Sequence, residues 1–457
     1  MKILLTHAYF LKDDPAEMKV MKPYFPLGLL YLSAWLDKKG FPNSVYDPTF
    51  RNIDDLKQHL DIQKPEIIAI YSTLMTKLNV LKILAHIRHF KDQKSVKVIV
   101  GGPDTRHNAD SYLEYGADVI IPGEGEQALA ETVKCFAGEN YYGLQKINGI
   151  IFKNKEGKVI KTTDRTFLSP EEWLFPSRES IDQSAYLKSW KETHGYSSMT
   201  ISTMRGCPYA CYWCSKSVFG NSYRRRSPAL VVAEMMLIKK TYNPDQLWFT
   251  DDVFTISQQW LRQFNDELIK NNILISYECI SRSDCLDDEI LGILKNTGCK
   301  KLWIGAESGS QKVIDLMNRK IDVEQTISVI KQARNKGIDT GTFLMLGYPG
   351  EKKNDIFGTA SYLKRACPEE VTIAMAYPIK GTRFYKDIES TFTEPFEWQK
   401  QTERQIRFKK AYSDRFYRFA VRYLMNTANS VKAKPALTKI VFSLKAGISK
   451  IYLLLFR

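Results

Sequence analysis

The sequence predicts an α/β protein with two βα regions and a helical tail. Short apolar runs alternate with helical patterns over the first 140 residues, and a second alternation of the same kind begins near residue 197. Such alternation is typical of parallel sheets covered by helices, and 457 residues suffice for two or three domains. We expect a doubly wound domain over 1–140, a connector over 141–196, a partial (β/α)6 barrel over 197–390 and a basic, amphipathic helical region over 391–457.

The first region alternates strands with helices from its start. Its expected strands are the apolar runs at residues 3–5, 67–71, 96–100 and 119–121, and its helical patterns occupy 27–36, 80–90 and 128–136. The connector is less regular, and Glu156-Gly157 predicts a hairpin within it.

The second region contains six further units. Ser227 before Pro228 predicts a helix start, because serine caps the first turn and proline fits its first position. Gly298 and Gly337 stand where a helix end favours glycine. The expected strands are residues 198–204, 246–250, 274–280, 301–306, 340–346 and 371–376.

Three clustered cysteines are the most informative residues of the chain. Cys207, Cys211 and Cys214 have the spacing CxxxCxxC, and no fourth cysteine lies within sixty residues. Three thiolates can hold a four-iron cube with one iron left open. A zinc loop or a bare group of thiols is the alternative, although a closed zinc site needs a fourth Cys or His. The other five cysteines are scattered, which favours a reducing interior over a disulfide framework.

The cysteine loop resembles the signature of the radical S-adenosylmethionine (SAM) superfamily, in which an aromatic residue precedes the last cysteine, as Trp213 does. The resemblance implies a [4Fe-4S] cluster on the three cysteines, with SAM chelated by the open iron. It also implies cleavage of SAM to methionine and a 5′-deoxyadenosyl radical, which removes a hydrogen atom from the substrate. The protein positions and shields this cofactor chemistry.

The same resemblance implies SAM contacts at the strand ends of the barrel, where function gathers in this architecture. Asp251 and Asp252 are implied to hold the SAM ammonium group, although two carboxylates could also complement a helix N-terminus. Arg282 is implied to face the SAM pocket, or it could pair with a barrel carboxylate. No residue is assigned to catalysis beyond these contacts. The remaining implied positions are Trp213 on the cluster loop, Glu307 at the pocket, Ser308 near the ribose and Gly347 beside the adenine.

Loops after three strands of the first region carry glycines and small polar residues. Ligands of doubly wound sheets bind at such loops, and glycines let backbone approach a bulky ligand closely. Ser72-x-Leu74, followed after 26 residues by Gly101-Gly102, resembles the cobalamin-binding flavodoxin-like domain. The resemblance implies that the serine and the two glycines line the slot for the cobalamin nucleotide tail. The other implied cobalamin contacts are Phe25, Leu74, Gly123, Glu124 and Gly125.

The Asp-x-His motif that supplies a cobalt ligand in that family is missing. The upstream segment contains Phe25-Pro26-Leu27-Gly28 instead, and none of the six histidines stands in the motif context. This pattern is similar to the cobalamin-dependent branch of the radical SAM superfamily. It implies cobalamin with its base displaced and no protein imidazole on cobalt, which would favour methyl transfer. A domain that no longer binds cobalamin is the alternative.

Arg224-Arg225-Arg226 follows the cysteine loop. The run could be a solvated basic turn. Alternatively, its guanidinium groups could stabilise an anionic cluster or help an acidic electron donor to dock.

Residues 391–457 contain 14 Lys and Arg against 4 Asp and Glu, a balance of +10 out of +15 for the chain. Over 435–457 an apolar row follows helical spacing, with Lys439 and Lys450 opposite. The tail could be a helical cap over the barrel, or a helix that binds a membrane surface or a partner. Nucleic-acid binding is a third alternative, although no recognisable RNA-binding module accompanies the tail. The row consists of Leu437, Ile440, Val441, Leu444, Ile448, Ile451 and Leu455.

No apolar run reaches the roughly 20 residues that span a bilayer, and no secretory signal is apparent at the start of the sequence. We therefore expect a cytoplasmic protein, with peripheral membrane association through the tail as the alternative.

These observations predict a cobalamin-dependent radical SAM enzyme that acts on an unactivated carbon. Its expected reaction is C-methylation of a small-molecule or lipid-like substrate, with a cyclase or other rearrangement enzyme as the alternative. The expected partners are this substrate and an electron donor such as flavodoxin or ferredoxin, without nucleic acid. An iron-sulfur electron carrier or an RNA-binding protein is the alternative from another class.

Overall fold

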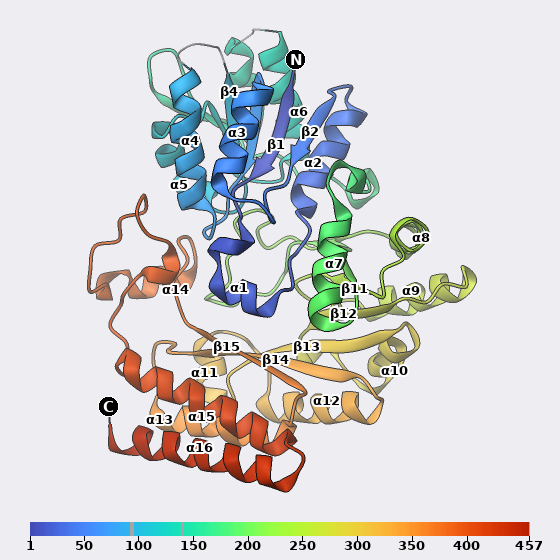
Figure 1. The fold of residues 1–457 in the computed structure, drawn as a ribbon, viewed down its shortest axis with the longest axis vertical. Helices are drawn as coiled ribbons and strands as arrows, with labels where there is room; N and C mark the ends of the chain where they lie inside the picture. Colours follow the sequence, from blue (N-terminus) through green and yellow to red (C-terminus); the bar gives the residue numbers. More distant parts are fainter. Residues whose placement is uncertain (92–95, 139–140, 457) are drawn as a thin grey trace. The chain divides into compact units, whose positions relative to one another are not determined.

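The computed structural model describes residues 1–91, 96–138 and 141–456. It contains two compact units, and neither is continuous in sequence. The first consists of Met1–Thr200, Ser215–Arg224 and Phe396–Gln405, and the second of Ile201–Cys214, Arg225–Pro395 and Ile406–Arg457. Figure 1 shows the elements of both units in sequence colours.

The first unit is built on a seven-stranded sheet of order β2-β1-β3-β4-β5-β6-β7, with five parallel strands and an antiparallel hairpin at one edge. Gly157, at a φ of 76°, turns the hairpin as predicted. The strands are β1 (Ile3–His7), β2 (Asn43–Tyr46), β3 (Ile67–Tyr71), β4 (Lys97–Gly101), β5 (Val119–Ile121), β6 (Ile151–Lys153) and β7 (Val159–Lys161).

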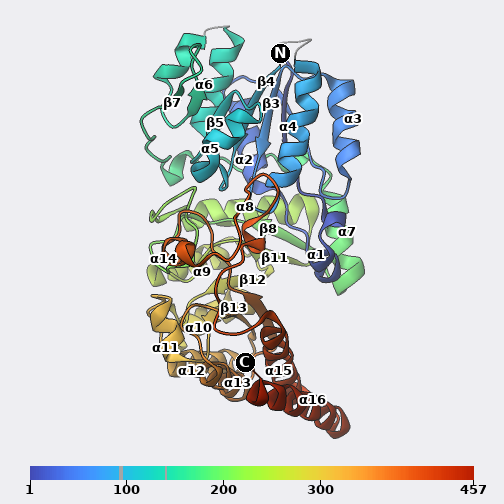
Figure 2. The same cartoon turned by 90° about the vertical axis from the view of Figure 1, so that its left-hand side faces the viewer.

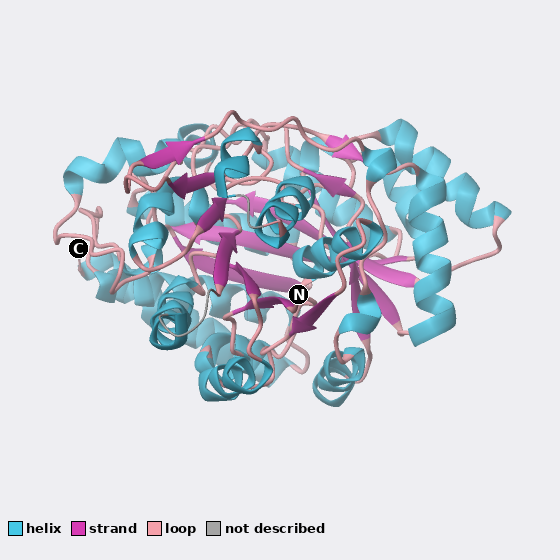
Figure 3. Cartoon of the chain, turned by 90° about the horizontal axis from the view of Figure 1, so that it is seen from above, coloured by secondary structure: helices cyan, strands magenta, loops and turns pink. Residues whose placement is uncertain are grey.

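Figure 3 shows the helices and strands of the chain from above. Successive strand residues point to opposite faces of the first unit's sheet, and the apolar residues on each face pack against helices. Leu4 of β1 belongs to a core with α3, α4 and α5, whereas its neighbours Ile3 and Leu5 belong to a second core with α2 and α6. The predicted doubly wound fold is confirmed. The helices are α1 (Pro15–Val20), α2 (Leu27–Lys38), α3 (Ile53–Gln63), α4 (Lys77–Lys91), α5 (Thr105–Glu114), α6 (Glu126–Ala137) and α7 (Gln183–His194).

The second sheet contains the six predicted βα strands, in the order β15-β14-β13-β12-β11-β8. The strands from β11 to β15 pair in parallel. The six strands are β8 (Ser198–Ile201), β11 (Gln246–Phe249), β12 (Ser276–Ser281), β13 (Cys299–Glu307), β14 (Asp339–Leu346) and β15 (Glu370–Met375).

The predicted helix ends of the second unit are also confirmed. The Ser227 hydroxyl accepts a hydrogen bond from Leu230 N and caps α8, and Gly298 and Gly337 have φ angles of 95° and 70°. The helices are α8 (Pro228–Tyr242), α9 (Gln258–Lys270), α10 (Asp288–Asn296), α11 (Gln311–Leu316), α12 (Val323–Asn335), α13 (Lys353–Ala366) and α14 (Arg383–Ile388).

The tail forms two helices, α15 (Asp414–Lys432) and α16 (Ala436–Leu455), which lie side by side in Figures 1 and 2. Helix α15 packs on α13 and buries Phe416, Tyr417 and Leu424. The prediction of a helical cap therefore holds for α15. It is wrong for the apolar row of α16, which is exposed. No helix in the described part of the chain is long and apolar enough to cross a bilayer.

Candidate functional site

The cysteine loop lies between two short strands, β9 (Met204–Arg205) and β10 (Arg224–Arg225), that form a small sheet of their own. None of the three cysteines forms a disulfide; Cys211 is buried and the other two are half-buried. Backbone contacts hold the loop in place: Tyr212 N donates to Met317 O at 3.1 Å, and Phe384 N donates to Tyr212 O at 2.9 Å. The Asn318 amide also donates to Ala210 O at 2.8 Å. The residues after α11 therefore support the loop.

Two guanidinium groups contact the sulfur of Cys211. Arg319 Nη1 lies 3.5 Å from Cys211 Sγ and Arg282 Nη1 lies 3.9 Å from it. Arg282 also bonds to both oxygens of Asp284, at 2.9 and 2.8 Å, and to Arg319 O at 2.8 Å. Burial lowers the pKa of Arg319, but Glu307 and the cysteine thiolates raise it, and the net shift is upward. The Cys211 sulfur therefore lies against fixed positive charge.

Glu307 lies beside the same arginine at the end of β13. Its carboxylate is 3.8 Å from Arg319 Nη2, and burial raises its pKa against the opposing effect of Arg319 and Arg282. Its φ of 61° coincides with a bulge after Gly305. A side chain at position 305 would collide with the Arg319 guanidinium. The neighbouring Ser308 is buried, and its hydroxyl lies 3.3 Å from that of Thr359.

The two adjacent aspartates have different environments. Asp251 is buried and accepts hydrogen bonds from the backbone N–H groups of Thr203 and Met204, at 2.7 and 3.2 Å. Burial raises its pKa, although Arg225 and the Thr203 bonds act to lower it. Asp251 therefore anchors the chain just before the cysteine loop. Asp252 is exposed.

Of the two interpretations of the arginine run, the solvated basic turn is wrong. Arg226 is buried and bonds to Glu234, and the Arg225 guanidinium lies over the Trp260 ring at 3.5 Å, with Asp251 at 3.7 Å. In the first unit, Arg224 bonds to Glu124. The guanidinium groups that contact Cys211 instead come from Arg282 and Arg319.

Gly347 directly follows β14, and Trp213 of the cysteine loop packs on a hydrophobic cluster that contains Ala376, the residue after β15. Gly347, at a φ of 79°, donates its N–H to Glu351 Oε2 at 2.6 Å. Burial raises the pKa of the fully buried Glu351 to about 8. Trp213 packs against a cluster that includes Met317 and Tyr348, and its indole nitrogen is buried without a hydrogen-bond partner.

Cys285 lies close to the loop, although its position in the sequence does not suggest this. The Tyr209 hydroxyl of the cysteine loop is 2.9 Å from Cys285 Sγ, and Arg282 covers the Tyr209 ring at 3.7 Å. Arg319 is the other residue of this site that the sequence reasoning missed. No local sequence motif marks either residue; in the structure Arg319 stands between Asn318 and Lys320, which both have positive φ.

In the first unit, the loops after β3 and β4 pack tightly against each other. The Ser72 hydroxyl is 2.7 Å from that of Tyr112, which in turn donates to Asp104 at 2.6 Å. Gly102 has a φ of 107°, and a side chain there would collide with Ser72 O. Ser72 and Gly102 therefore shape the loops from within, whereas Leu74 and Gly101 are half-buried.

The loop after β5 contains the remaining predicted cobalamin contacts. Glu124 accepts hydrogen bonds from Arg224 and from Leu168 N, and Gly125 precedes the first turn of α6. Gly123 and Gly125 are half-buried. Phe25 is buried and stacks on Tyr186 with ring centroids 4.3 Å apart.

His7 is the histidine at the carboxyl end of β1, on this edge of the sheet. Its Nε2 lies 3.0 Å from Asp47 Oδ1, and its Nδ1 accepts a hydrogen bond from Tyr9 N at 3.1 Å. Both ring nitrogens are therefore engaged within the protein.

Two family models match the chain, one in each region of predicted function. The B12 binding domain matches residues 18–133 and the radical SAM superfamily matches residues 201–363. The chain is a radical SAM enzyme with a B12-binding domain. Its cofactors are accordingly a [4Fe-4S] cluster, SAM and cobalamin.

Relatives of this radical SAM enzyme match along most of its length. An uncharacterized methyltransferase of Pyrococcus horikoshii is 25% identical over 82% of this chain and 81% of its own. An anaerobic magnesium-protoporphyrin IX monomethyl ester cyclase of Rubrivivax gelatinosus is 23% identical over 88% and 72%. The solved structure of the cobalamin-dependent SAM radical enzyme OxsB with aqua-cobalamin has a TM-score of 0.76 at 16% identity, covering 99% of this chain and 72% of that one. The structural likeness supports the fold.

The donor set of this radical SAM enzyme fits an iron-sulfur cluster. No three His, Cys, Asp or Glu side chains among the described residues converge tightly enough to hold a single metal ion. A four-iron cube distributes its thiolates over separate iron atoms, so its cysteines need not meet at one point. The three cysteine thiols on one supported loop, with two guanidinium groups at Cys211, suit an anionic cluster.

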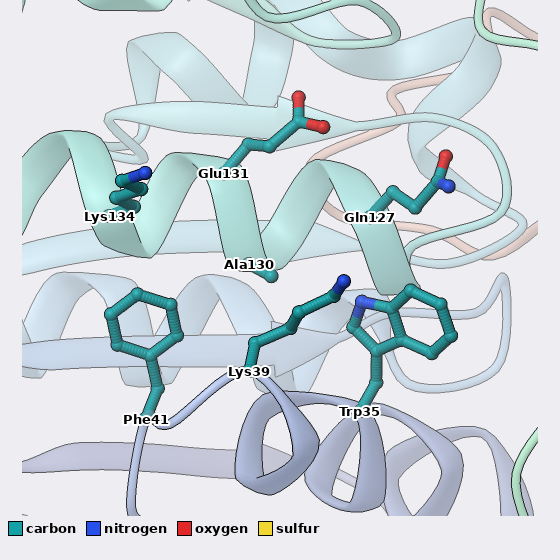
Figure 4. A pocket seen from close by; sticks show the side chains of 7 residues that line it. All are labelled: Trp35, Lys39, Phe41, Gln127, Ala130, Glu131 and Lys134. Atoms are coloured by element: carbon teal, nitrogen blue, oxygen red, sulfur yellow. The ribbon is translucent and has the colours of Figure 1, made fainter.

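The enzyme also has a hollow in the first unit, between α2 and α6 (Figure 4). It is lined by Trp35, Lys39 and Phe41 on one side and by Gln127, Ala130, Glu131 and Lys134 on the other. None of these residues belongs to the predicted SAM or cobalamin contacts. Glu131 is paired with Arg165, and Lys39 lies over the Trp35 ring at 5.1 Å. We assign no role in the reaction to this hollow.

Proposed function

We propose that this radical SAM enzyme methylates an unactivated carbon of a small-molecule substrate. In this reaction SAM on the reduced cluster would supply a 5′-deoxyadenosyl radical that removes a hydrogen atom, and methylcobalamin would supply the methyl group. A second SAM would then remethylate the cobalamin, reduced by the electron donor, and leave as S-adenosylhomocysteine. The presence of both cofactor domains in one chain carries the proposal. A relative that is named a methyltransferase and matches 82% of the chain supports it.

The residues of the second unit receive the following roles in this proposal. Cys207, Cys211 and Cys214 hold the cluster, while Arg282 and Arg319 neutralise thiolate charge at Cys211. The SAM ammonium group is assigned to Asp252, which is exposed, because Asp251 is engaged with backbone N–H groups. Glu307, Ser308, Gly347 and Trp213 complete the SAM site.

The residues of the first unit receive roles according to their exposure. Leu74, Gly101, Gly123 and Gly125 are half-buried in the loops at the strand ends, and we assign them to direct cobalamin contact. Glu124, whose carboxylate bonds to Arg224 and to Leu168 N, is assigned to holding the loop after β5 in place. Ser72, Gly102 and Phe25 are buried in contacts with their own unit, so we assign them to shaping the loops. His7 is not assigned to cobalt, because both its ring nitrogens are engaged.

An acidic one-electron donor of the flavodoxin or ferredoxin kind completes the proposed reaction. The net charge of +15 favours encounter with such a partner. The rate of cluster reduction by such a donor should therefore fall as salt is added.

The test is an anaerobic assay of the full chain with reconstituted cluster, methylcobalamin, reductant and SAM. Methylation should yield S-adenosylhomocysteine together with 5′-deoxyadenosine, and the cobalt spectrum should change with turnover. Formation of 5′-deoxyadenosine without S-adenosylhomocysteine would instead indicate a cyclase or other rearrangement enzyme, the activity for which the Rubrivivax gelatinosus relative is named. The absence of SAM cleavage by the reduced, reconstituted protein would reject both reactions.

A further inference from the structure

The outward face of α16 is a continuous apolar row. Apart from the adjacent Ile440 and Val441, its residues follow one another at intervals of three or four, so they share one side of the helix. Their exposed fractions run from 40% at Val441 to 72% at Leu455. The helix has 20 residues and is therefore about 30 Å long. The row, which we call the α16 face, consists of Leu437, Ile440, Val441, Leu444, Ile448, Ile451 and Leu455.

The α16 face is not needed to hold the helix in place. Helix α16 packs on α15 through another side, where Ala446, Ser449 and Leu453 are buried. Tyr452 stacks on Phe419 of α15 with ring centroids 3.8 Å apart. A continuous exposed apolar patch of this kind marks an interaction site.

Cations accompany the α16 face, and no acidic residue follows Asp414 in the tail. Lys439, Lys445 and Lys450 are exposed on α16 itself, and Lys450 Nζ lies 5.5 Å from the centre of the Phe357 ring. Arg415 of α15 lies 5.5 Å from the ring of Tyr452. After Asp414 the sequence contains nine Lys and Arg and no Asp or Glu. The tail therefore combines an exposed apolar row with exposed positive charge, because Lys445 lies beside the row and Lys439 and Lys450 lie on the opposite side of the helix.

These properties select one class of partner. A second copy of the same face would bring like charges together, and a nucleic acid would place its phosphates against Leu and Ile side chains. An anionic lipid surface provides negative headgroups for the lysines and arginines on the polar side of the tail and an apolar layer for the row. We propose that the α16 face docks, with the helix lying in the plane of the interface, on an anionic lipid membrane. This inference does not depend on the proposed methylation.

The test is co-sedimentation of the full chain with phosphatidylcholine vesicles that contain or lack phosphatidylglycerol, at low and high salt. The chain should bind the anionic vesicles at low salt. The face variant carries Ile440→Ser, Leu444→Ser and Ile448→Ser. Its affinity for the anionic vesicles should fall by about tenfold or more. A control variant changes three equally exposed residues elsewhere, Ile62→Ser, Ile269→Ser and Leu274→Ser, with exposures of 62–70%, and should bind like the parent.

A second variant examines the charges. Lys439→Gln, Lys445→Gln and Lys450→Gln should remove the preference for anionic over neutral vesicles, and circular dichroism should show that every variant remains folded. Failure of the parent to bind anionic vesicles, or equal binding by the face and control variants, would overturn the proposal. Sedimentation without lipid gives a further test: a dimer that the face variant abolishes would assign the face to self-association and would also overturn it.

Discussion

Cys211 is the cluster cysteine that contacts two positively charged side chains. Its sulfur contacts the guanidinium groups of Arg319 and Arg282, at 3.5 and 3.9 Å. Arg319 is further fixed by Glu307 and by Gly305 O, the latter at 2.9 Å. Positive charge held beside a thiolate stabilises whichever cluster state carries more negative charge. The two arginines should therefore make the cluster easier to reduce.

We predict that Arg319→Met lowers the reduction potential of the reconstituted cluster. A charge-assisted contact worth about 1.5 kcal/mol corresponds to about 60 mV for a one-electron couple. An EPR-monitored redox titration measures the shift. Lys331→Met, which removes an exposed cation on α12, serves as the control. An Arg319→Met potential equal to that of the parent would show that the guanidinium does not act on the cluster.

Glu351 is a second residue whose environment has a measurable consequence. It is fully buried, and burial raises its pKa from 4.5 to about 8, with Asp355 adding to the shift and the Gly347 N–H opposing it. The folded state holds the proton of the Glu351 carboxyl more tightly than the unfolded state does. The protonated carboxyl therefore makes its full contribution to folding stability below about pH 4.5. This contribution is lost as the pH rises toward about 8.

Because glutamine does not titrate, Glu351→Gln should lose less folding stability than the parent as the pH rises from about 4.5 to about 8. The difference in unfolding free energy, variant minus parent, should rise by up to about 1.4 kcal/mol per pH unit in that window. Urea unfolding at several pH values measures it, with Asp266→Asn, at an exposed carboxylate, as the control. Parallel pH profiles for Glu351→Gln and the parent would contradict the prediction.

At the scale of elements, the ends of β3 and β4 depend on one glycine. Gly102 combines a φ of 107° with backbone contact to Ser72, whose hydroxyl is held by Tyr112. The loops after these strands therefore fix each other's position.

We predict that Gly102→Ala destabilises the first unit by several kcal/mol and weakens cobalamin binding. Gly157→Ala is the matched control, since Gly157 also has a positive φ, 76°, but open space around it. The control should cost only about 1–2 kcal/mol, the strain of a left-handed conformation. Urea unfolding and spectroscopic titration with cobalamin measure the two effects. Equal losses in both variants would mean that contact with Ser72 is unimportant.

Elements with strong apolar periodicity could be predicted from the sequence, and weakly patterned ones could not. The run at 67–71 is β3 with the predicted bounds. The sequence pattern does not reveal β2, whose residues Asn43–Tyr46 are half-buried or exposed, or α3, which buries only Leu56 and Leu60. Helix α16 was found, but its periodicity could not show that the apolar side faces solvent, because the burial of a helix depends on its neighbours.

At the scale of the whole molecule, each unit is assembled from separate stretches of chain. Residues Phe396–Gln405 belong to the first unit. Their Glu403 forms an ion pair with Lys77 at 3.1 Å, and both side chains are almost fully buried. Burial raises the pKa of Glu403, while Lys77 lowers it. Trp398 packs edge-on against Tyr112 in the same region.

Lys77→Met should destabilise the first unit by about 3–5 kcal/mol, because it leaves the Glu403 carboxyl buried without its cation. The double variant Lys77→Met with Glu403→Met should recover much of this loss. Chemical unfolding and limited proteolysis within 396–405 measure both effects. A double variant as unstable as Lys77→Met alone would show that the loss does not arise from the unpaired carboxyl.

Parts of the site formed by residues close together in the sequence could be predicted, and parts formed by distant residues could not. The cysteine spacing is local, so the loop and its cofactor could be inferred from the sequence. Arg319 contacts Cys211 from 108 residues away, and Cys285 meets Tyr209 from 76 residues away. Both pairings are produced by the packing of β12, α11 and the cysteine loop. Asp251 and Asp252 have the same local pattern, and only the fold distinguishes the buried anchor from the exposed carboxylate.

The three-segment composition of the first unit affects how the gene can be divided. A shortened gene that stops after Thr200 would encode most of that unit, yet it would omit Arg224 and Glu403. Glu124 and Lys77, which those residues contact, would then lose these partners. A cobalamin-binding fragment for expression therefore needs grafted copies of 215–224 and 396–405, joined by designed linkers.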